Sequence, residues 1–284
     1  MCRLFGQRAD PDFDVCEPLC GAENALRTQS HQHPHGWGIG WYLGRVPEVR
    51  RGTVPAHADE AFVRAARAAR SHLVVAHVRD ASVGRIRPEN THPFVAGHWI
   101  FAHNGTVARF RESGRIRAAI EAEIAPRRRR RIRGDTDSER CFYLFLTRLA
   151  AAGPGQASLP QVRRALAETV ERVARIADAP ARRSTLNFLV SDGRLLAACR
   201  RGRSLHVALP GPDGHLFAVA SEPIGRTGWA EVPEGGFVGV DASLRVLVGP
   251  LFAGGATRAP APPSPSGSGR GRRPRPPAPR RASA

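Results

Sequence analysis

The stretch LNFLVSDGRLLAACR, residues 186–200, indicates the fold class most directly. Two short apolar runs, 186–191 and 194–200, lie on either side of the dipeptide Asp192-Gly193. Asp-Gly is a two-residue connection that favours the tight turn of a β-hairpin, because both positions tolerate positive φ angles. We therefore expect two antiparallel strands here, within a sheet that other segments extend.

Segments of the same kind lie on both sides of this hairpin. Short runs rich in β-branched and aromatic residues predict further strands at 36–43, 73–79, 99–103, 216–221, 236–240 and 244–249. Helices are predicted at 59–70, 137–151 and 159–177, and Thr136-Asp137-Ser138-Glu139 has the form of a capping box that begins the second of them. Strands open and close the chain and most helices fall between them. This order favours an α+β fold, with antiparallel sheets covered by helices.

The chain has 284 residues, of which 42% are hydrophobic, enough for one large domain with an apolar core. We predict this domain at 1–253, followed by a disordered Arg/Pro-rich tail at 254–284 that has few apolar residues to bury. We predict no membrane span, since no long apolar run occurs. The first twenty residues carry charges and prolines rather than a signal peptide. A cytoplasmic location is therefore expected, with the five cysteines as free thiols.

The net charge of +18 is concentrated in two segments. Residues 127–133 contain six arginines, and the tail contains seven with no acidic residue. Neither segment interleaves arginine with the aromatic side chains that a nucleic-acid stacking surface needs. We interpret both as solvated segments, with weak polyanion binding by the tail as an open hypothesis. A nucleic-acid-binding protein is the alternative from a different functional class.

Cys2 is the first candidate catalytic residue. Removal of Met1 would leave its thiol beside a free α-amine. That amine has an ordinary pKa of about 7.7–8.0, so it is able to act as the general base for the thiol near neutral pH. One residue would then supply both nucleophile and base, although a cysteine at position 2 often has no function.

Three later motifs carry groups that suit the chemistry of an amide substrate. Arg79, in AHVRDASVG, follows a predicted strand and is able to hold a carboxylate through a bidentate pair; a structural ion pair is the alternative. Asn104 and Gly105, in WIFAHNGT, offer a side-chain amide and a backbone N–H to an oxyanion, or they form an ordinary Asn-Gly turn. Asp137, in GDTDSE, is placed to meet an ammonium group or simply to begin a helix.

The segment HPHGWG, residues 33–38, gives weaker indications. His31, His33 and His35 alternate along the chain, but no carboxylate or cysteine follows at metal-ligand spacing, so we predict no metal site. Gly36, Trp37 and Gly38 are expected to shape the wall beside the nucleophile. Cys16 and Cys20 lack a partner pair and are interpreted as ordinary thiols.

Taken in order, these motifs resemble a known family. MCRLFG, HGWGIGWY, VAHVR, ENTHPF, AHNG and GDTDSE are similar to the class II glutamine amidotransferases, in particular their stand-alone YafJ-like branch. The γ-glutamyl hydrolases of ergothioneine synthesis share much of the pattern. The resemblance covers roughly residues 2–250 and implies the Ntn-hydrolase fold, a four-layer αββα sandwich of two stacked antiparallel sheets. His35 departs from it, since many relatives have an acidic residue there.

The resemblance also implies a mechanism. Cys2 attacks the δ-carboxamide of glutamine, Asn104 and the Gly105 N–H stabilise the oxyanion, and water hydrolyses the resulting thioester. Arg79 is expected to hold the substrate α-carboxylate and Asp137 its α-ammonium. His92, within ENTHPF, and Trp37 complete the predicted substrate-binding set. No metal or organic cofactor is required.

The resemblance leaves the substrate and the partners open. A glutaminase of this class delivers ammonia, and a separate synthase is one hypothesis for its acceptor. The alternative function is hydrolysis of a γ-glutamyl amide in a small molecule or peptide. A homodimer is compatible with the sequence, which does not test it.

Overall fold

The computed structural model describes residues 2–151, 153, 155–209, 216–226 and 228–252, without the side chains of 10–13. Sheet A contains, in spatial order, β11 (Trp229–Glu231), β9 (His206–Ala208), β10 (Leu216–Ala220), β1 (Arg3–Phe13), β4 (Ser71–Val78), β2 (Trp37–Leu43) and β3 (Val46–Gly52). Sheet B contains β13 (Val246–Pro250), β12 (Gly236–Val240), β8 (Leu196–Cys199), β7 (Thr185–Ser191), β6 (Trp99–Thr106) and β5 (Phe94–Ala96). The predicted tail at 254–284 lies outside the described residues.

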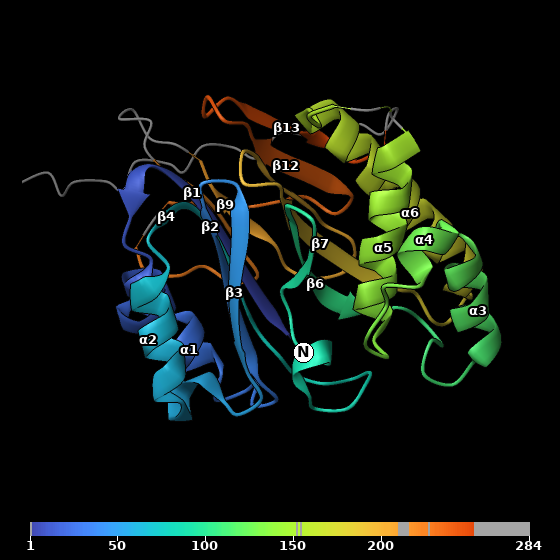
Figure 1. Ribbon diagram of the computed structural model, residues 1–284, viewed down its shortest axis with the longest axis horizontal. Helices are drawn as coiled ribbons and strands as arrows, with labels where there is room; N and C mark the ends of the chain where they lie inside the picture. The colour runs from blue at the N-terminus through green and yellow to red at the C-terminus, as the bar shows by residue number, and fades with distance from the viewer. Residues whose placement is uncertain (1, 152, 154, 210–215, 227, 253–284) are drawn as a thin grey trace, which may run out of the picture.

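Helices cover the outer face of each sheet (Figure 1). Those on sheet A are α1 (Leu26–Gln29) and α2 (Glu60–Ala68), and those on sheet B are α3 (Gly114–Ala122), α4 (Pro126–Arg129), α5 (Asp137–Ala151) and α6 (Leu159–Ala177). Short helical turns are η1 (Glu17–Gly21), η2 (Ala56–Ala58) and η3 (Pro88–Asn90). No helix in the described ranges is long and apolar enough to span a lipid bilayer.

Three apolar clusters account for this layered order. Leu4, Val75 and Leu189 belong to a cluster between the two sheets. Trp37 and Phe62 belong to a second, which joins sheet A to its helices. The third and largest cluster packs sheet B against α3, α5 and α6. Each sheet therefore buries both faces, and the predicted αββα sandwich is confirmed.

The hairpin at 186–200 forms as predicted, and β7 pairs antiparallel with β8. The three predicted helices and all the other predicted strands are present, with ends that differ by a few residues. The largest difference lies in β6, which continues through Asn104 and Gly105 to Thr106. Asn104 pairs with Asn187 on β7, so the alternative of an Asn-Gly turn is wrong.

The central strand of sheet A was not predicted. β1 lies between β4 and β10, with Phe5 opposite Ala76 on one side and Ala220 on the other. Its sequence mixes apolar residues with charges, glycine and proline, so it shows no clear alternation. Its position therefore depends on pairing with strands distant in sequence.

The start of α5 fits the predicted capping box only in part. The Glu139 N–H donates to Thr136 Oγ1 at 3.3 Å, as expected. The Glu139 carboxylate instead accepts the N–H groups of Arg133 and Gly134, at 2.9 and 2.7 Å. Glu139 thus closes the loop before α5 rather than the cap itself, because that loop turns back toward the helix and presents unpaired N–H groups.

Candidate active site

Cys2 lies at the start of β1, beside the end of β4. Arg3 pairs with Val78, so the residue before Arg3 comes next to the residues that follow Val78. The Cys2 Sγ atom lies 3.4 Å from the backbone oxygen of Asp80 and 3.4 Å from its nitrogen. Burial raises the pKa of the half-buried Cys2 thiol, while the Asp80 N–H and the Arg79 charge oppose that rise. The thiol therefore needs a base near neutral pH.

A small cavity of about 20 Å³ opens beside Cys2. It is lined by Cys2, Arg79, Asp80, Ala81, Ser82, Val83, His92, His103, Gly105, Thr136, Asp137 and Ser138. The structure thus brings five predicted site residues together from β1, β6, the start of α5 and the loops after β4. The volume suits roughly one water molecule.

Arg79 is almost fully buried at the edge of this cavity, with 2% of its surface exposed. Its guanidinium donates to the backbone oxygens of Arg85, Val83 and Gly84, at 3.1, 3.0 and 3.2 Å. Burial lowers the pKa of Arg79, but arginine remains charged at neutral pH. The alternative of a structural ion pair does not describe these contacts, because all three acceptors are carbonyl groups.

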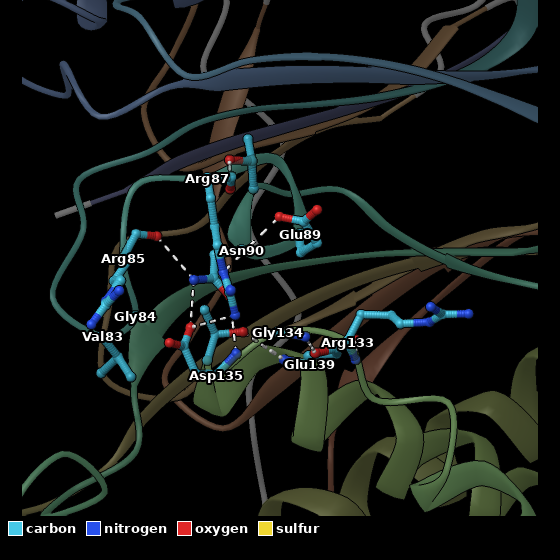
Figure 2. A network of polar contacts seen from close by, with 12 residues as sticks. Val83, Gly84, Arg85, Arg87, Glu89, Asn90, Arg133, Gly134, Asp135 and Glu139 are labelled. Carbon is cyan, nitrogen blue, oxygen red and sulfur yellow. Dashed lines mark hydrogen bonds and ion pairs between the residues drawn. The ribbon is translucent and has the colours of Figure 1, made fainter.

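The loop at residues 83–85, whose carbonyl groups accept from Arg79, is also held by Asn90 and Asp135. Figure 2 shows the contacts of Asn90 and Asp135. The Asn90 side-chain amide donates to the Arg85 oxygen at 2.9 Å and to the Asp135 carboxylate. The Asp135 N–H returns a 3.0 Å bond to Asn90 Oδ1, and Arg87 lies 3.6 Å from the same carboxylate. Asn90 is completely buried, so its hydrogen bonds are shielded from water. The loop is therefore held by the Asn90–Asp135 network on one side and by Arg79 on the side of the cavity.

Gly84 leaves room for the Asn90–Asp135 network because it has no side chain. A methyl group at this position would lie 2.7 Å from Asp135 Oδ1 and 2.9 Å from Asn90 Nδ2. Its φ of +76° is also in the left-handed region that favours glycine. The loop geometry therefore depends on a residue without a side chain.

Asn104 and Gly105 lie on β6 with Gly105 facing the cavity. The Asn104 amide donates to Ser221 Oγ at 3.0 Å, and the same hydroxyl oxygen accepts the Leu4 N–H at 3.0 Å. Among the described residues, neither the second N–H of this amide nor its buried Oδ1 has a hydrogen-bond partner. A methyl group on Gly105 would lie 1.9 Å from the Thr185 oxygen, so this position admits glycine alone.

Asp137 reaches the cavity from the first turn of α5. Its Oδ2 accepts the Val107 N–H at 2.7 Å and its Oδ1 accepts the Ser138 N–H at 2.9 Å. These two bonds fix the orientation of the carboxylate. A buried carboxylate opposite Arg79 gives the cavity one negative and one positive wall.

Three buried histidines lie at the site: His92 and His103 line the cavity, and His77 packs against His92. His103 bonds Thr185 O through Nε2 at 3.0 Å and Ser138 Oγ through Nδ1 at 2.9 Å. The His77 ring lies 4.2 Å from that of His92, and neither ring nitrogen of His92 has a partner in the described chain. Burial lowers the pKa of His77 to about 3 and that of His92 well below its usual range. All are therefore neutral at neutral pH.

The HPHGWG segment supports the site only in part as predicted. His35 N–H donates to Arg79 O at 2.9 Å, and Arg79 N–H donates to Gly36 O at 2.8 Å, which positions the loop beside Cys2. Trp37 is absent from the described cavity lining: its Nε1 donates to Asp59 at 2.8 Å and its ring packs on Phe62. The prediction of a substrate-binding Trp37 is thus corrected, since its side chain points to the outer face of sheet A.

His31, His33 and His35 each make separate contacts, and the cysteines form no disulfide bond. His31 stacks on His57, His33 is buried, and His35 lies 3.0 Å from Asp80. Within the described ranges, no three His, Cys, Asp or Glu side chains gather as a metal site. All five cysteines are free thiols.

Three supporting residues were missed by the sequence analysis. Ser221 ends a predicted strand, Asp80 follows Arg79, and Asn90 belongs to ENTHPF, yet no role was predicted for any of them. Asn90 and Asp80 lay within motifs that signalled the site, ENTHPF and AHVRDASVG, whereas Ser221 did not. Ser221 and Asp80 act through a hydroxyl group and the backbone, which leave no distinctive spacing in a sequence.

Comparisons with known proteins find similar chains over most of this sequence. The family model of class-II glutamine amidotransferases matches residues 1–227. A γ-glutamyl-hercynylcysteine sulfoxide hydrolase of Mycobacterium tuberculosis is 33% identical over 214 residues, which cover 74% of this chain and 77% of the relative. Escherichia coli YafJ, named as a candidate glutamine amidotransferase, is 29% identical over 206 residues, or 70% of this chain and 72% of the relative.

Solved structures show the same fold. A glutamine aminotransferase class-II domain protein from Silicibacter pomeroyi superposes with a TM-score of 0.63 and 24% identity, covering 88% of this chain and all of that one. A phosphoribosylpyrophosphate amidotransferase of Bacillus subtilis gives a TM-score of 0.60 at 17% identity, covering 89% of this chain and 50% of the other. At these identities the likeness concerns the fold alone.

Proposed function

The chain belongs to the class II glutamine amidotransferases, and from that premise we propose that it hydrolyses the side-chain amide of glutamine to glutamate and ammonia. One observation carries the proposal: Cys2, Arg79, Gly105 and Asp137 line a single cavity, although they come from four separate segments. A nucleophile, a carboxylate-binding cation, an oxyanion donor and an ammonium-binding anion then surround one small volume. A polyanion-binding protein would have no use for this combination.

The first chemical step begins at the Cys2 sulfur. With Met1 removed, the α-amine of Cys2 takes the thiol proton, and the thiolate attacks the δ-carbon of the substrate. The Asp80 N–H, 3.4 Å from Sγ, favours the thiolate. As the C–N bond breaks, the protonated amine returns its proton to the leaving nitrogen, which departs as ammonia. Water then hydrolyses the thioester and releases glutamate.

The transition state requires donors for the oxyanion. The Gly105 N–H and the spare N–H of the Asn104 amide are proposed for this role, since Ser221 Oγ already fixes the amide orientation. Arg79 would bind the α-carboxylate and Asp137 the α-ammonium. His92 would border the substrate as a neutral ring, because burial depresses its pKa.

A second function has specific support. Three curated relatives from mycobacteria are named γ-glutamyl-hercynylcysteine sulfoxide hydrolases, at 30% to 33% identity. The same catalytic groups are able to cleave any γ-glutamyl amide, because they address the glutamyl half of the substrate. Hydrolysis of a γ-glutamyl small molecule or peptide is therefore the alternative. In the glutaminase proposal the ammonia passes to a separate synthase or to solvent.

Mass spectrometry tests the nucleophile. The full chain is incubated with diazo-oxo-norleucine, a glutamine analogue with an electrophilic carbon. The expected intact mass lacks Met1 and carries one adduct, which maps to Cys2. The matched control is Cys141→Ala, which removes a buried thiol and should label normally. Retention of Met1 in active protein, or an adduct on another cysteine, would overturn the proposed mechanism.

Steady-state kinetics tests the substrate. Glutamine and γ-glutamyl amides of small amines, peptides and thiols are compared by kcat/KM, with glutamate release as the common readout. Glutamine is expected to have the highest value. A preference of tenfold or more for a γ-glutamyl amide, about 1.4 kcal/mol in transition-state binding, would replace the first proposal by the second while leaving Cys2 as nucleophile.

A further inference from the structure

A second and larger cavity, of about 430 Å³, lies in the helical layer on sheet B. It is bounded by the arginine run that begins in α4, the later turns of α5, residues 153 and 155–157 of the α5–α6 connection, the start of α6 and the β5–β6 turn. None of the residues that line the Cys2 cavity contributes to it. Its size lies within the range of small-molecule sites.

Arginine supplies the charge of this cavity. Arg127, Arg128 and Arg131 line it, whereas Arg129 and Arg130 of the same run do not. Residues four apart share one face of a helical turn, so Arg127 and Arg131 lie on the face of the run that borders the cavity, where both remain exposed to solvent. None of the described lining residues is acidic. The cavity therefore carries a concentrated positive charge with no internal counter-ion.

The contrast with neighbouring arginines is informative. Arg140 pairs with Glu121 at 2.9 Å, Arg172 pairs with Glu123 at 2.6 Å, and Arg148 also pairs with Glu123. The guanidinium groups of residues 127–131 have no ion pair or side-chain hydrogen bond to any described residue. Burial lowers the pKa of Arg128, and the charges of Arg127 and Arg131 lower it further. An anion in the cavity would relieve this mutual repulsion.

The arginine segment is held in place rather than free to swing. The Ala125 N–H donates to Thr147 Oγ1 at 3.2 Å at one end, and Tyr143 OH donates to Arg131 O at 3.2 Å at the other. Both anchors are side chains of α5. The cavity is thus assembled in advance of any ligand, which lowers the entropic cost of binding.

We propose that this cavity binds an anionic ligand that carries two or more phosphate groups. Guanidinium groups match phosphate oxygens through paired N–H donors, and several cations in one site favour a multiply charged anion over a single carboxylate. Trp99, Leu146 and Leu149 provide apolar lining beside the arginines. An organic phosphate such as a nucleotide therefore fits as well as an inorganic polyphosphate. The site is independent of the reaction at Cys2.

Titration calorimetry on the full chain tests the proposal, with pyrophosphate, ATP and adenosine as separate probes. Binding of ATP and pyrophosphate, and none of adenosine, is expected. Arg127→Gln/Arg131→Gln should weaken binding by at least about tenfold. The matched control Arg129→Gln/Arg130→Gln removes the same charge from the same run but from outside the cavity, and should change the affinity less than about twofold.

The two probes distinguish the sources of phosphate. If ATP binds more tightly than pyrophosphate, the apolar lining contacts the organic part of the ligand. If the two bind equally, only the phosphate chain is recognised. Either outcome supports the site. Equal weakening by the two double variants would reveal diffuse attraction and overturn the proposal, as would no binding of either phosphate at millimolar concentration. Arg127→Lys/Arg131→Lys keeps the positive charges but lacks the paired N–H donors of guanidinium, so it should weaken binding in part. This variant provides the test if the glutamine variant folds poorly.

Discussion

Arg79 and Arg128 carry the same guanidinium group in two opposite settings. Arg79 donates to three backbone carbonyls in a loop that Asn90 and Asp135 hold from the other side. Arg128 lies among like charges, and its side chain has no partner in the described ranges. The comparison teaches that the partners of an arginine, rather than its presence, separate a residue that builds a site from one available to a ligand.

Substitution of the two arginines should give the largest contrast. Arg79→Gln is expected to lower kcat/KM for glutamine by roughly a hundredfold to a thousandfold, because the bonds to the loop and the proposed charged contact to the substrate carboxylate are both lost. Arg128→Gln should leave it within about twofold. Steady-state assays with thermal melting as a folding control provide the measurement. Similar losses for both variants would remove the distinction between the two regions.

Two glycines sharpen the comparison through stability. Gly84 sits in the Arg79 loop and Gly97 borders the second cavity, with left-handed φ values of +76° and +61°. Gly97→Ala should cost about 1–2 kcal/mol, the penalty of that conformation, since nothing lies within 4 Å of its new methyl group. Gly84→Ala should cost roughly 1–2 kcal/mol more, because the methyl group collides with Asn90 and Asp135.

Chemical denaturation of the two glycine variants, at matched protein concentration, gives both free energies of unfolding. Equal costs would show that the Asn90–Asp135 network yields easily, and that the Arg79 loop is no firmer than the edge of the second cavity.

Acid should affect the two regions unequally. His77 and His33 have pKa values lowered by burial to about 3 and about 4, against about 6.5 in the unfolded chain. The unfolded state therefore binds more protons, and stability falls as the pH drops below about 6.5. Each histidine contributes up to about 1.4 kcal/mol per pH unit between pH 6.5 and 5. The free energy of unfolding at several pH values measures this slope.

His33→Asn should reduce that acid slope, whereas Arg128→Gln should leave it unchanged, because arginine does not titrate in this range. A slope that His33→Asn leaves intact would mean that His33 is protonated as readily in the folded protein as in the unfolded chain.

Local signals predicted an α+β fold with antiparallel sheets covered by helices, and the family resemblance implied its four-layer order. The hairpin at 186–200 and the three long helices follow from turn chemistry and apolar spacing, which act over a few residues. β1 could not be found in this way, because its place at the centre of sheet A is set by pairing with β4 and β10, which lie far from it in the sequence. Local patterns carry no information about such pairing.

The Trp37 error has an equally specific cause. Side chains alternate across a strand, so Trp37 and Gly38 on β2 face opposite sides of sheet A. A methyl group on Gly38 would lie 2.0 Å from the His92 oxygen, which places Gly38 on the side of the site. The position of Trp37 within its motif placed the residue near the site. The face of the sheet on which its side chain lies depends on the strand register, and the predicted strand began one residue earlier than β2 does.

The pairing of Phe5 with Ala220 has a consequence for the timing of synthesis. The N-terminal strand emerges first from the ribosome but cannot complete sheet A until some two hundred further residues follow. At about 5–20 residues per second, this delay lasts on the order of 10 to 40 s. During this delay the proposed oxyanion donor Asn104 lacks Ser221, which orients its amide, so the proposed removal of Met1 would come before the proposed site is complete. Late completion of sheet A would thus separate the proposed removal of Met1 from the onset of reactivity at Cys2.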